Sequence, residues 1–255
     1  MIDLHTHILP GVDDGSECLE ESLEMAELAL EGGTGTLVVT PHSNQTGRFE
    51  NYHSELLMEQ FRKLEEAVKK RNLPLKLYRG MEIYASWDVA EKIADGRLIG
   101  LGSSDYYLVE FPFDMEADDM GDILESFLNL GKIPLIAHPE RYACIQHNPG
   151  IVYEWMRIGC LSQINKGSLF GRFGNRAAKA AEILMDFQLV TCIASDAHSS
   201  VMRTPYLGDI REVIEGRYGR EYAQRLLFEN PKAILGNDEI TFEGSPPVRR
   251  YRIFR

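Results

Sequence analysis

The chain begins with two histidines, His5 and His7, separated by one residue, and two acidic residues, Asp13 and Asp14, follow in the next loop. Imidazole and carboxylate groups together are donors that suit divalent transition metals. A lone His-x-His is weak support for a metal site, because alternate residues of a strand point to opposite faces. Both rings reach one ion only if the strand end bends, so the pair gains meaning only together with other donors.

Residues of the same types recur along the chain, each near the end of a short apolar run. They are His42, Glu82, Glu110, His138, Asp196 and His198. Taken alone, Glu110 could be a buried paired carboxylate, and Glu82 could be a residue that leads a helix. A donor residue after nearly every apolar run is hard to explain by accident. Because crowding this much charge is unfavourable unless cations neutralise it, we expect a metal site.

Short β-rich runs alternate with longer amphipathic runs, and this alternation predicts repeated βα units around a parallel sheet, closed as a barrel or left open. The expected strands are Ile2–His5, Thr36–Thr40, Leu75–Met81, Tyr106–Phe111, Ile133–Ala137, Leu161–Ile164 and Val190–Ala194. The expected helices are Glu20–Leu30, Glu55–Lys70, Trp87–Ala94, Met120–Leu130, Val152–Ile158, Arg176–Phe187, Leu207–Arg217 and Arg220–Glu229. In a parallel barrel the carboxyl ends of the strands meet at one rim, so the donor residues would share one site.

Two arginines lie close to the expected donors. Arg141 follows His138 by three residues, and Arg203 lies in the loop after His198. A guanidinium fork suits the non-bridging oxygens of a phosphate. The alternative for Arg141 is a salt bridge to Glu140 or another local acid, and spacing alone does not decide between the two.

The bulk composition is that of a globular protein, with 44% hydrophobic and 26% charged residues in a chain of 255. The net charge of −12 argues against a nucleic acid or an anionic membrane as partner. No signal-peptide pattern opens the chain and no apolar run is long enough to span a bilayer, so we expect a cytoplasmic protein without membrane insertion. The four cysteines are scattered, which favours reduced structural thiols.

These motifs resemble the PHP (polymerase and histidinol phosphatase) superfamily, most closely its manganese-dependent bacterial protein-tyrosine phosphatases of capsule and exopolysaccharide synthesis. The resemblance is carried by His5-Thr6-His7, Asp14, Pro41-His42, Glu82, Glu110, His138-Pro139-Glu140-Arg141-Tyr142 and Ser195-Asp196-Ala197-His198. It implies an α/β fold, a distorted seven-stranded (β/α)7 TIM-like barrel (the PHP fold), over residues 1–235. Residues 236–255 fall outside it and are expected to form a surface-bound or flexible tail, with an oligomer contact as the alternative.

The resemblance also implies the roles of the site residues, with two or three divalent ions per chain. His5, His7, Glu82 and Asp196 would hold one ion, Glu82 would bridge to a second held by Glu110 and His138, and Asp14, His42 and His198 would hold a third. Manganese is expected, with iron, cobalt or zinc as alternatives. Arg141 and Arg203 match the positions that bind substrate phosphate, and Asp14 or His198 could supply a proton.

The implied function is hydrolysis of a phosphomonoester, with a phosphotyrosine-bearing protein such as an exopolysaccharide-regulating tyrosine kinase as substrate. A small-molecule phosphatase of the histidinol-phosphatase type is the alternative, and a homo-oligomer stays open. A cysteine-dependent mechanism is excluded, because no cysteine is followed by arginine six residues later. An amidohydrolase would favour a lysine at a strand end, where this chain has Glu82 and Glu110. The intact donor set argues against a barrel kept only as a binding module.

Overall fold

The computed structural model describes residues 1–247 as an α/β fold with two parallel sheets. The sheet orders are β1-β2-β4 and β3-β5-β6-β7-β8-β9. The strands are β1 (Ile2–Thr6), β2 (Thr36–Val39), β3 (His42–Ser43), β4 (Lys76–Arg79), β5 (Glu82–Tyr84), β6 (Tyr106–Glu110), β7 (Ile133–Ala137), β8 (Leu161–Asn165) and β9 (Cys192–Ala194). The expected α/β fold with parallel strands is therefore confirmed.

Two of the expected strands are each followed, after a break, by a short strand that was not predicted and that belongs to the second sheet. The break between β2 and β3 falls at Thr40 and Pro41, and the break between β4 and β5 falls at Gly80 and Met81. Proline has no N–H to donate to a sheet, and a Cβ on Gly80 would lie only 2.8 Å from the Leu101 side chain. Residues 1–247 contain no closed hydrogen-bonded barrel, so the expected count of seven strands is not confirmed.

The first strand, β1, lies beside the last, β9, where the two sheets meet. An isolated parallel bridge pairs Thr6 with Ala197. The amide of Asp196 donates to the His5 carbonyl at 3.0 Å, and the amide of His7 donates to the Ala197 carbonyl at 2.9 Å. This contact brings donor residues from the two ends of the fold together.

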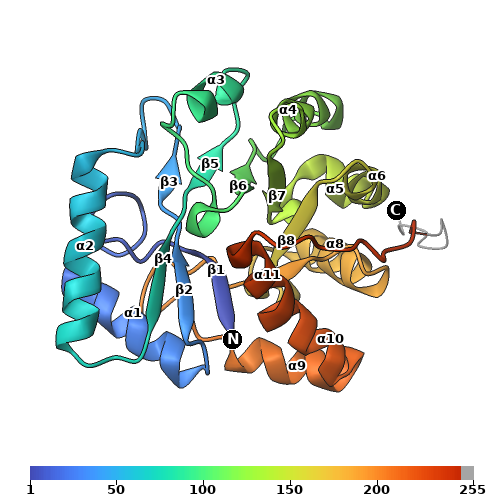
Figure 1. Cartoon of the computed structure of the whole chain (residues 1–255). Helices are drawn as coiled ribbons and strands as arrows, with labels where there is room; N and C mark the ends of the chain where they lie inside the picture. The colour runs from blue at the N-terminus through green and yellow to red at the C-terminus, as the bar shows by residue number, and fades with distance from the viewer. Residues whose placement is uncertain (248–255) are drawn as a thin grey trace.

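Helices surround the sheets, with α1 and α2 beside the β1-β2-β4 sheet and α4 to α8 on the opposite side of the molecule (Figure 1). The helices are α1 (Leu19–Glu31), α2 (Glu55–Lys70), α3 (Val89–Ala94), α4 (Ala117–Asn129), α5 (Ala143–His147), α6 (Gly150–Arg157), α7 (Lys166–Leu169), α8 (Asn175–Asp186), α9 (Gly208–Tyr218), α10 (Arg220–Gln224) and α11 (Asn230–Gly236). Short 3-10 turns lie at Leu101–Ser103 and Pro139–Arg141, and a π-helical turn lies at Arg225–Glu229. Every expected helix is present, whereas α5, α7 and α11 were not predicted.

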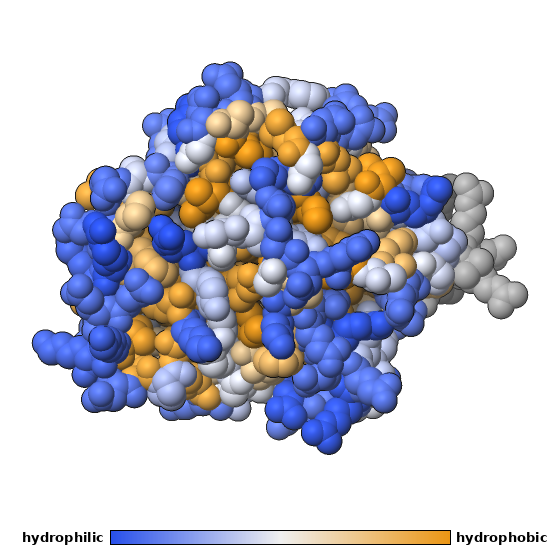
Figure 2. All heavy atoms as spheres, in the orientation of Figure 1, coloured by the Kyte–Doolittle hydropathy of each residue, from blue (hydrophilic) through white to orange (hydrophobic). Residues whose placement is uncertain are grey.

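The longer helices bury apolar residues. In α2 the buried residues are Phe61, Leu64 and Val68, whereas Leu56, near the start of the helix, is 70% exposed. On the face seen in Figure 2, hydrophilic residues dominate the outline, and hydrophobic residues gather between them. Among residues 1–247 no helix has the length and apolar character needed to cross a membrane.

The segment 237–247 has no helix or strand but packs against the body of the fold. The Tyr106 hydroxyl donates to the Asp238 carbonyl at 2.6 Å, and the rings of Phe242 and Tyr153 have centroids 5.8 Å apart. This part of the expected tail is therefore in contact with the sheets and helices. The basic residues Arg249, Arg250, Arg252 and Arg255 lie outside the described part of the chain.

Candidate metal centre

All residues expected to bind metal lie together, at or after the ends of β1, β6, β7 and β9 and at the first residues of β3 and β5. His5 belongs to β1, His42 to β3, Glu82 to β5 and Glu110 to β6, while His7, Asp14, His138, Asp196 and His198 follow β1, β7 and β9. Most of them are buried, whereas His42 and His198 are partly exposed and the Asp14 side chain is 44% exposed. The folded chain thus brings together side chains that are far apart in the sequence.

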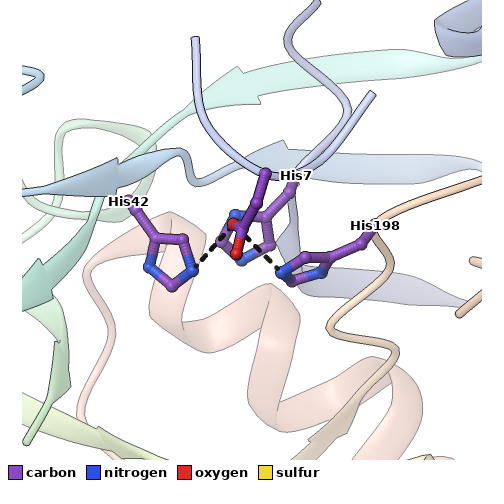
Figure 3. A group of neighbouring side chains, drawn as sticks. His7, His42 and His198 are labelled. Atoms are coloured by element: carbon purple, nitrogen blue, oxygen red, sulfur yellow. Dashed lines mark ion pairs between the residues drawn. The ribbon is translucent and has the colours of Figure 1, made fainter. Parts of the chain in front are cut away.

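The donor atoms form three overlapping groups, and within each group they lie within 4.8 Å of one another. The groups are His5, His7 and Asp196; His42, Glu82 and Glu110; and His7, Asp14, His42 and His198. Figure 3 shows the rings of His7, His42 and His198 turned toward a common space. His138 borders the second group, because its Nε2 lies 3.0 Å from Glu82 Oε1 and 3.7 Å from Glu110 Oε1.

The carboxylate of Glu82 lies at the centre of these groups. Its Oε2 is 3.2 Å from His5 Nε2, 3.1 Å from His7 Nε2 and 2.9 Å from His42 Nδ1. Within residues 1–247 this buried oxygen nevertheless has no hydrogen-bond partner. Imidazole nitrogens that converge on a carboxylate oxygen without hydrogen-bond geometry suit a cation between them. The residues present therefore fit a divalent metal.

Asp13 forms a hydrogen bond with Nδ1 of His7 and so fixes the orientation of the His7 ring. Asp13 Oδ2 accepts from His7 Nδ1 at 2.8 Å and from the amide of His42 at 2.9 Å, and Asp13 Oδ1 accepts from the Gly15 amide at 3.0 Å. Burial alone would raise the pKa of Asp13, but His7 and these hydrogen bonds lower it to about 2. Asp13 is thus an ionised partner that leaves His7 Nε2 facing the centre. This role of Asp13 was not predicted.

Two amides of β8, Gln163 and Asn165, connect His5 with Asp196. Gln163 Oε1 lies 2.9 Å from His5 Nδ1, and Gln163 Nε2 donates to Asn165 Oδ1 at 2.8 Å. Asn165 Nδ2 then donates to Asp196 Oδ2 at 2.5 Å. All four side chains are buried, so this chain of hydrogen bonds fixes the directions of two expected ligands. This chain of hydrogen bonds was not predicted, although amides at alternate positions of a buried strand are a usable signal.

Burial and like charges shift the pKa values of several donors. Burial, reinforced by the Glu82 carboxylate, raises the pKa of Glu110 to about 8. Burial, reinforced by the Arg141 guanidinium, lowers the pKa of His138 to about 4, and burial beside another imidazole lowers that of His198 to about 2. Both histidines are therefore neutral at ordinary pH, which is the form that binds metal.

An open pocket of about 460 Å³ lies over the donors, and Arg141 and Arg203 line it. Arg141 Nη1 lies 3.5 Å from Asp196 Oδ2, and Arg203 forms an ion pair with the same oxygen. Glu140 instead accepts a hydrogen bond from Ser168, and the alternative Arg141–Glu140 salt bridge does not form within residues 1–247. A larger pocket of about 860 Å³ between α8 and α10 contains none of the expected site residues.

Two further side chains at this pocket were not predicted. Arg48, from the loop after β3, lies 3.3 Å from Asp14 Oδ2, and Phe113 follows β6 with 43% of its surface exposed. Both residues could have been found from the sequence, because each lies beyond the end of an expected strand and is basic or aromatic. The pocket therefore has cations and an aromatic ring at its mouth above a carboxylate-rich floor.

A buried set of imidazoles and carboxylates below guanidinium groups, at the carboxyl ends of parallel strands, defines the class of metal-dependent phosphohydrolases. The family model described as "Capsular polysaccharide synthesis, CpsB/CapC" matches residues 1–236, and the chain belongs to this family.

Named relatives cover the whole chain. The chain is 35% identical over 254 residues to tyrosine-protein phosphatase YwqE of Bacillus subtilis (strain 168), with 100% of this chain and 99% of the relative covered. It is 33% identical over 245 residues to tyrosine-protein phosphatase CpsB of Streptococcus agalactiae serotype V, with 94% and 100% covered. The expected family of capsule-associated tyrosine phosphatases is therefore confirmed.

A solved structure agrees with this assignment. The crystal structures of YwqE from Bacillus subtilis and CpsB from Streptococcus pneumoniae are described as those of metal-dependent tyrosine phosphatases. The chain matched there has a TM-score of 0.90 and 35% sequence identity, and the match covers 98% of this chain and 100% of that one. The fold and the metal dependence of the class thus agree with the donor set described above.

Proposed function

We propose that this protein is a metal-dependent protein-tyrosine phosphatase with a distorted PHP-type barrel. The observation that carries the proposal is the convergence of His5, His7 and His42 on the buried Glu82 carboxylate beneath two arginines. Its membership of a family whose named relatives are tyrosine-protein phosphatases supports the same activity.

The proposed ligands are the donors that the folded chain gathers. They are His5, His7, Asp14, His42, Glu82, Glu110, His138, Asp196 and His198. When bound, two or three divalent ions, with manganese expected, supply Lewis acidity that activates water near neutral pH and neutralises phosphate charge. Asp13 and Gln163 keep the imidazoles of His7 and His5 oriented toward the centre.

The pocket residues supply phosphate binding and proton transfer. Arg141 and Arg203 can donate to the non-bridging phosphate oxygens and neutralise the charge that spreads over them in the transition state. Asp14 Oδ1 lies 3.7 Å from His198 Nε2 at the same pocket, so either group can orient a water molecule that gives its proton to the leaving oxygen. A phenolate leaves more readily than an alkoxide and needs less of this help.

The proposed substrate is a phosphotyrosine segment of a protein, such as a tyrosine kinase that regulates exopolysaccharide synthesis. A small phosphomonoester of the histidinol-phosphate type would use the same chemistry and is the second candidate. The cytoplasmic location stays a prediction, and so does the native metal.

The test measures turnover by protein stripped with a chelator and then reloaded with manganese. We expect hydrolysis of p-nitrophenyl phosphate and of a phosphotyrosine peptide, with histidinol phosphate and a nucleotide as competing substrates. His138→Ala should abolish turnover, whereas His147→Ala, at an exposed position on α5, should not. The proposal fails if the reloaded protein hydrolyses no phosphomonoester and His138→Ala changes only thermal stability.

A further inference from the structure

The Arg141 guanidinium lies against the rings of two phenylalanines. Arg141 Cζ lies 4.5 Å from the ring centroid of Phe113 and 4.4 Å from that of Phe173. Both distances lie within the ~6 Å over which a cation is attracted to an aromatic face. Phe113 follows β6 and Phe173 follows α7, so the tertiary fold and not local sequence brings the two rings to Arg141.

Phe173 contacts both arginines of the pocket. Its ring centroid also lies 5.5 Å from Arg203 Cζ. The ring fits because the facing residue is glycine: a Cβ on Gly167 would lie 3.0 Å from Phe173 Cε2. Phe173 is partly buried, so its ring can form a fixed surface against both guanidinium groups.

The turn that carries Phe113 is attached to the segment that carries Arg141. The Phe113 carbonyl accepts from the Ala143 amide at 2.8 Å, and the Phe113 ring centroid lies 6.0 Å from those of His138 and Tyr142. The ring therefore has a fixed place beside Arg141 even though 43% of its surface is exposed.

Polar contacts alone leave Arg141 poorly oriented. Its side chain donates one hydrogen bond within residues 1–247, to Asp196 Oδ2 at 3.5 Å. Arg203 shares that oxygen, and its buried Nε has no hydrogen-bond partner in the same range. Contact with two aromatic rings restricts the movement of the guanidinium while Arg141 still lines the pocket.

We propose that Phe113 and Phe173 are positioning residues that hold the Arg141 guanidinium at the phosphate pocket, with Phe173 supporting Arg203 as well. This inference rests on the proposed function, because it takes phosphate to be the group that the arginines bind. The rings act through the arginines, so their removal weakens phosphate binding and leaves metal binding intact.

The probe is inorganic phosphate, titrated calorimetrically into manganese-loaded protein, with metal content measured on each sample. Phe173→Leu keeps an apolar side chain but removes the ring, and we expect its Kd for phosphate to rise about tenfold. Phe173→Tyr keeps the ring and should stay within about twofold of the parent protein. Steady-state kinetics should show a higher KM for Phe173→Leu with a smaller change in kcat.

A double-mutant cycle separates positioning from direct contact. Phe113→Leu should weaken phosphate binding in the parent protein and add nothing in an Arg141→Ala background. Because inorganic phosphate has no aromatic ring, contact of Phe113 with a leaving group contributes nothing to this result. The cycle also decides the matter if Phe173→Leu does not fold.

Three results would overturn the inference. The first is a Phe173→Leu protein that binds phosphate as tightly as the parent, and the second is a variant that loses metal together with phosphate. The third is an equal effect of Phe113→Leu with and without Arg141. If the parent protein itself binds no phosphate, the proposed function falls too, whereas an unchanged variant beside a binding parent removes only the positioning role.

Discussion

At the scale of single residues, Arg141 is a pocket residue that can bind substrate but cannot bind metal. It lies beside Asp196 at 3.5 Å and lines the pocket, but it has no lone pair to offer a cation. Its neighbour His138 has a pKa lowered to about 4, first by burial and then by this guanidinium. The positive charge of Arg141 therefore helps to keep His138, an expected metal ligand, neutral, and the same charge suits a bound anion.

Replacing Arg141 should affect the substrate and leave the metal in place. We expect Arg141→Ala to lower kcat/KM by about tenfold or more, because a charge-assisted hydrogen bond to phosphate is lost. Metal analysis of the purified variant should give the same ions per chain as the parent. Arg157→Ala, at an exposed position on α6, is the control. Loss of bound metal in Arg141→Ala would show that the arginine has a different role.

The sequence predicts which residues of donor type lie together, but it does not predict the residues that orient them. Most of the donors stand near the end of an apolar run, so residue type and position suffice to find His42 or Glu82. Gln163 is different, because its importance comes from His5, which lies 158 positions away in the sequence. Such long-range partners become visible only when the strands are placed side by side.

At the scale of elements, the loop after β1 folds back closely on the strand that it leaves. The Ser16 amide donates to the His7 carbonyl at 2.9 Å, and the Gly11 amide donates to the Ser16 carbonyl at 2.8 Å. A Cβ on Gly15 would lie 2.1 Å from the His7 carbonyl oxygen. Only glycine allows this approach, which places Asp13 behind His7 and Asp14 in the pocket.

We therefore expect Gly15→Ala to displace this loop and impair the metal centre. The overlap should cost about 1–3 kcal/mol of unfolding free energy, and it should lower manganese affinity because Asp13 and Asp14 move. Urea denaturation and metal titration measure the two effects. Gly35→Ala is a matched control, since nothing lies within 4 Å of a Cβ there. Equal manganese affinity in both variants would contradict the expectation.

The starts of β6 and β7 are joined by an ion pair whose strength depends on pH. Lys132 Nζ lies 2.6 Å from Asp105 Oδ1, and Asn237 donates to Asp105 Oδ2 at 3.1 Å. The Lys132 hydrogen bond, followed by that of Asn237, lowers the pKa of Asp105 below its ordinary value of 3.8. A carboxyl with a lowered folded-state pKa adds stability above its unfolded pKa and loses that contribution as the pH falls through the folded value.

Lys132→Met should accordingly be less stable than the parent at pH 7, by up to about 1 kcal/mol for this partly exposed pair. The difference should shrink as the pH falls below about 4, because Asp105 becomes protonated in both proteins. Urea unfolding at pH 7 and pH 3 measures it. A difference that grew toward low pH would rule out this origin.

Element boundaries were harder to predict than element types. Helix α4 begins at Ala117, three residues before the expected Met120. The prediction began too late because the first turn is acidic and has no apolar pattern. Asp118 and Asp119 do suit a helix N-terminus. The short strand β3 begins directly after Pro41, beyond the expected strand Thr36–Thr40, and its two residues are too few to show an apolar pattern. Short helices such as α7 have too few residues for an apolar period to show.

At the scale of the whole molecule, the segment after α11 contributes to the folded body. Phe242 packs beside Tyr153 and against the main apolar cluster. Arg225 forms an ion pair with Glu243 at 2.6 Å. Composition alone predicted a tail here, because the segment contains prolines and charged residues and only two or three apolar residues that make contact.

Shortening one of these residues should therefore destabilise the fold without touching the pocket. We expect Phe242→Ala to lower the free energy of unfolding by about 1–3 kcal/mol, from lost burial of a partly buried aromatic ring. Phosphatase activity at a permissive temperature should stay near that of the parent. Glu239→Ala, exposed and three residues earlier, should leave Tm almost unchanged. Identical Tm values for the two variants would mean that Phe242 contributes no packing energy.

The bridge between Thr6 and Ala197 determines when the centre can form during synthesis. His5 and His7 leave the ribosome almost two hundred positions before Asp196 and His198. Domains generally fold as units once their chain is available. An unfinished chain consequently holds only part of the proposed donor set, which becomes complete when β9 lies against β1.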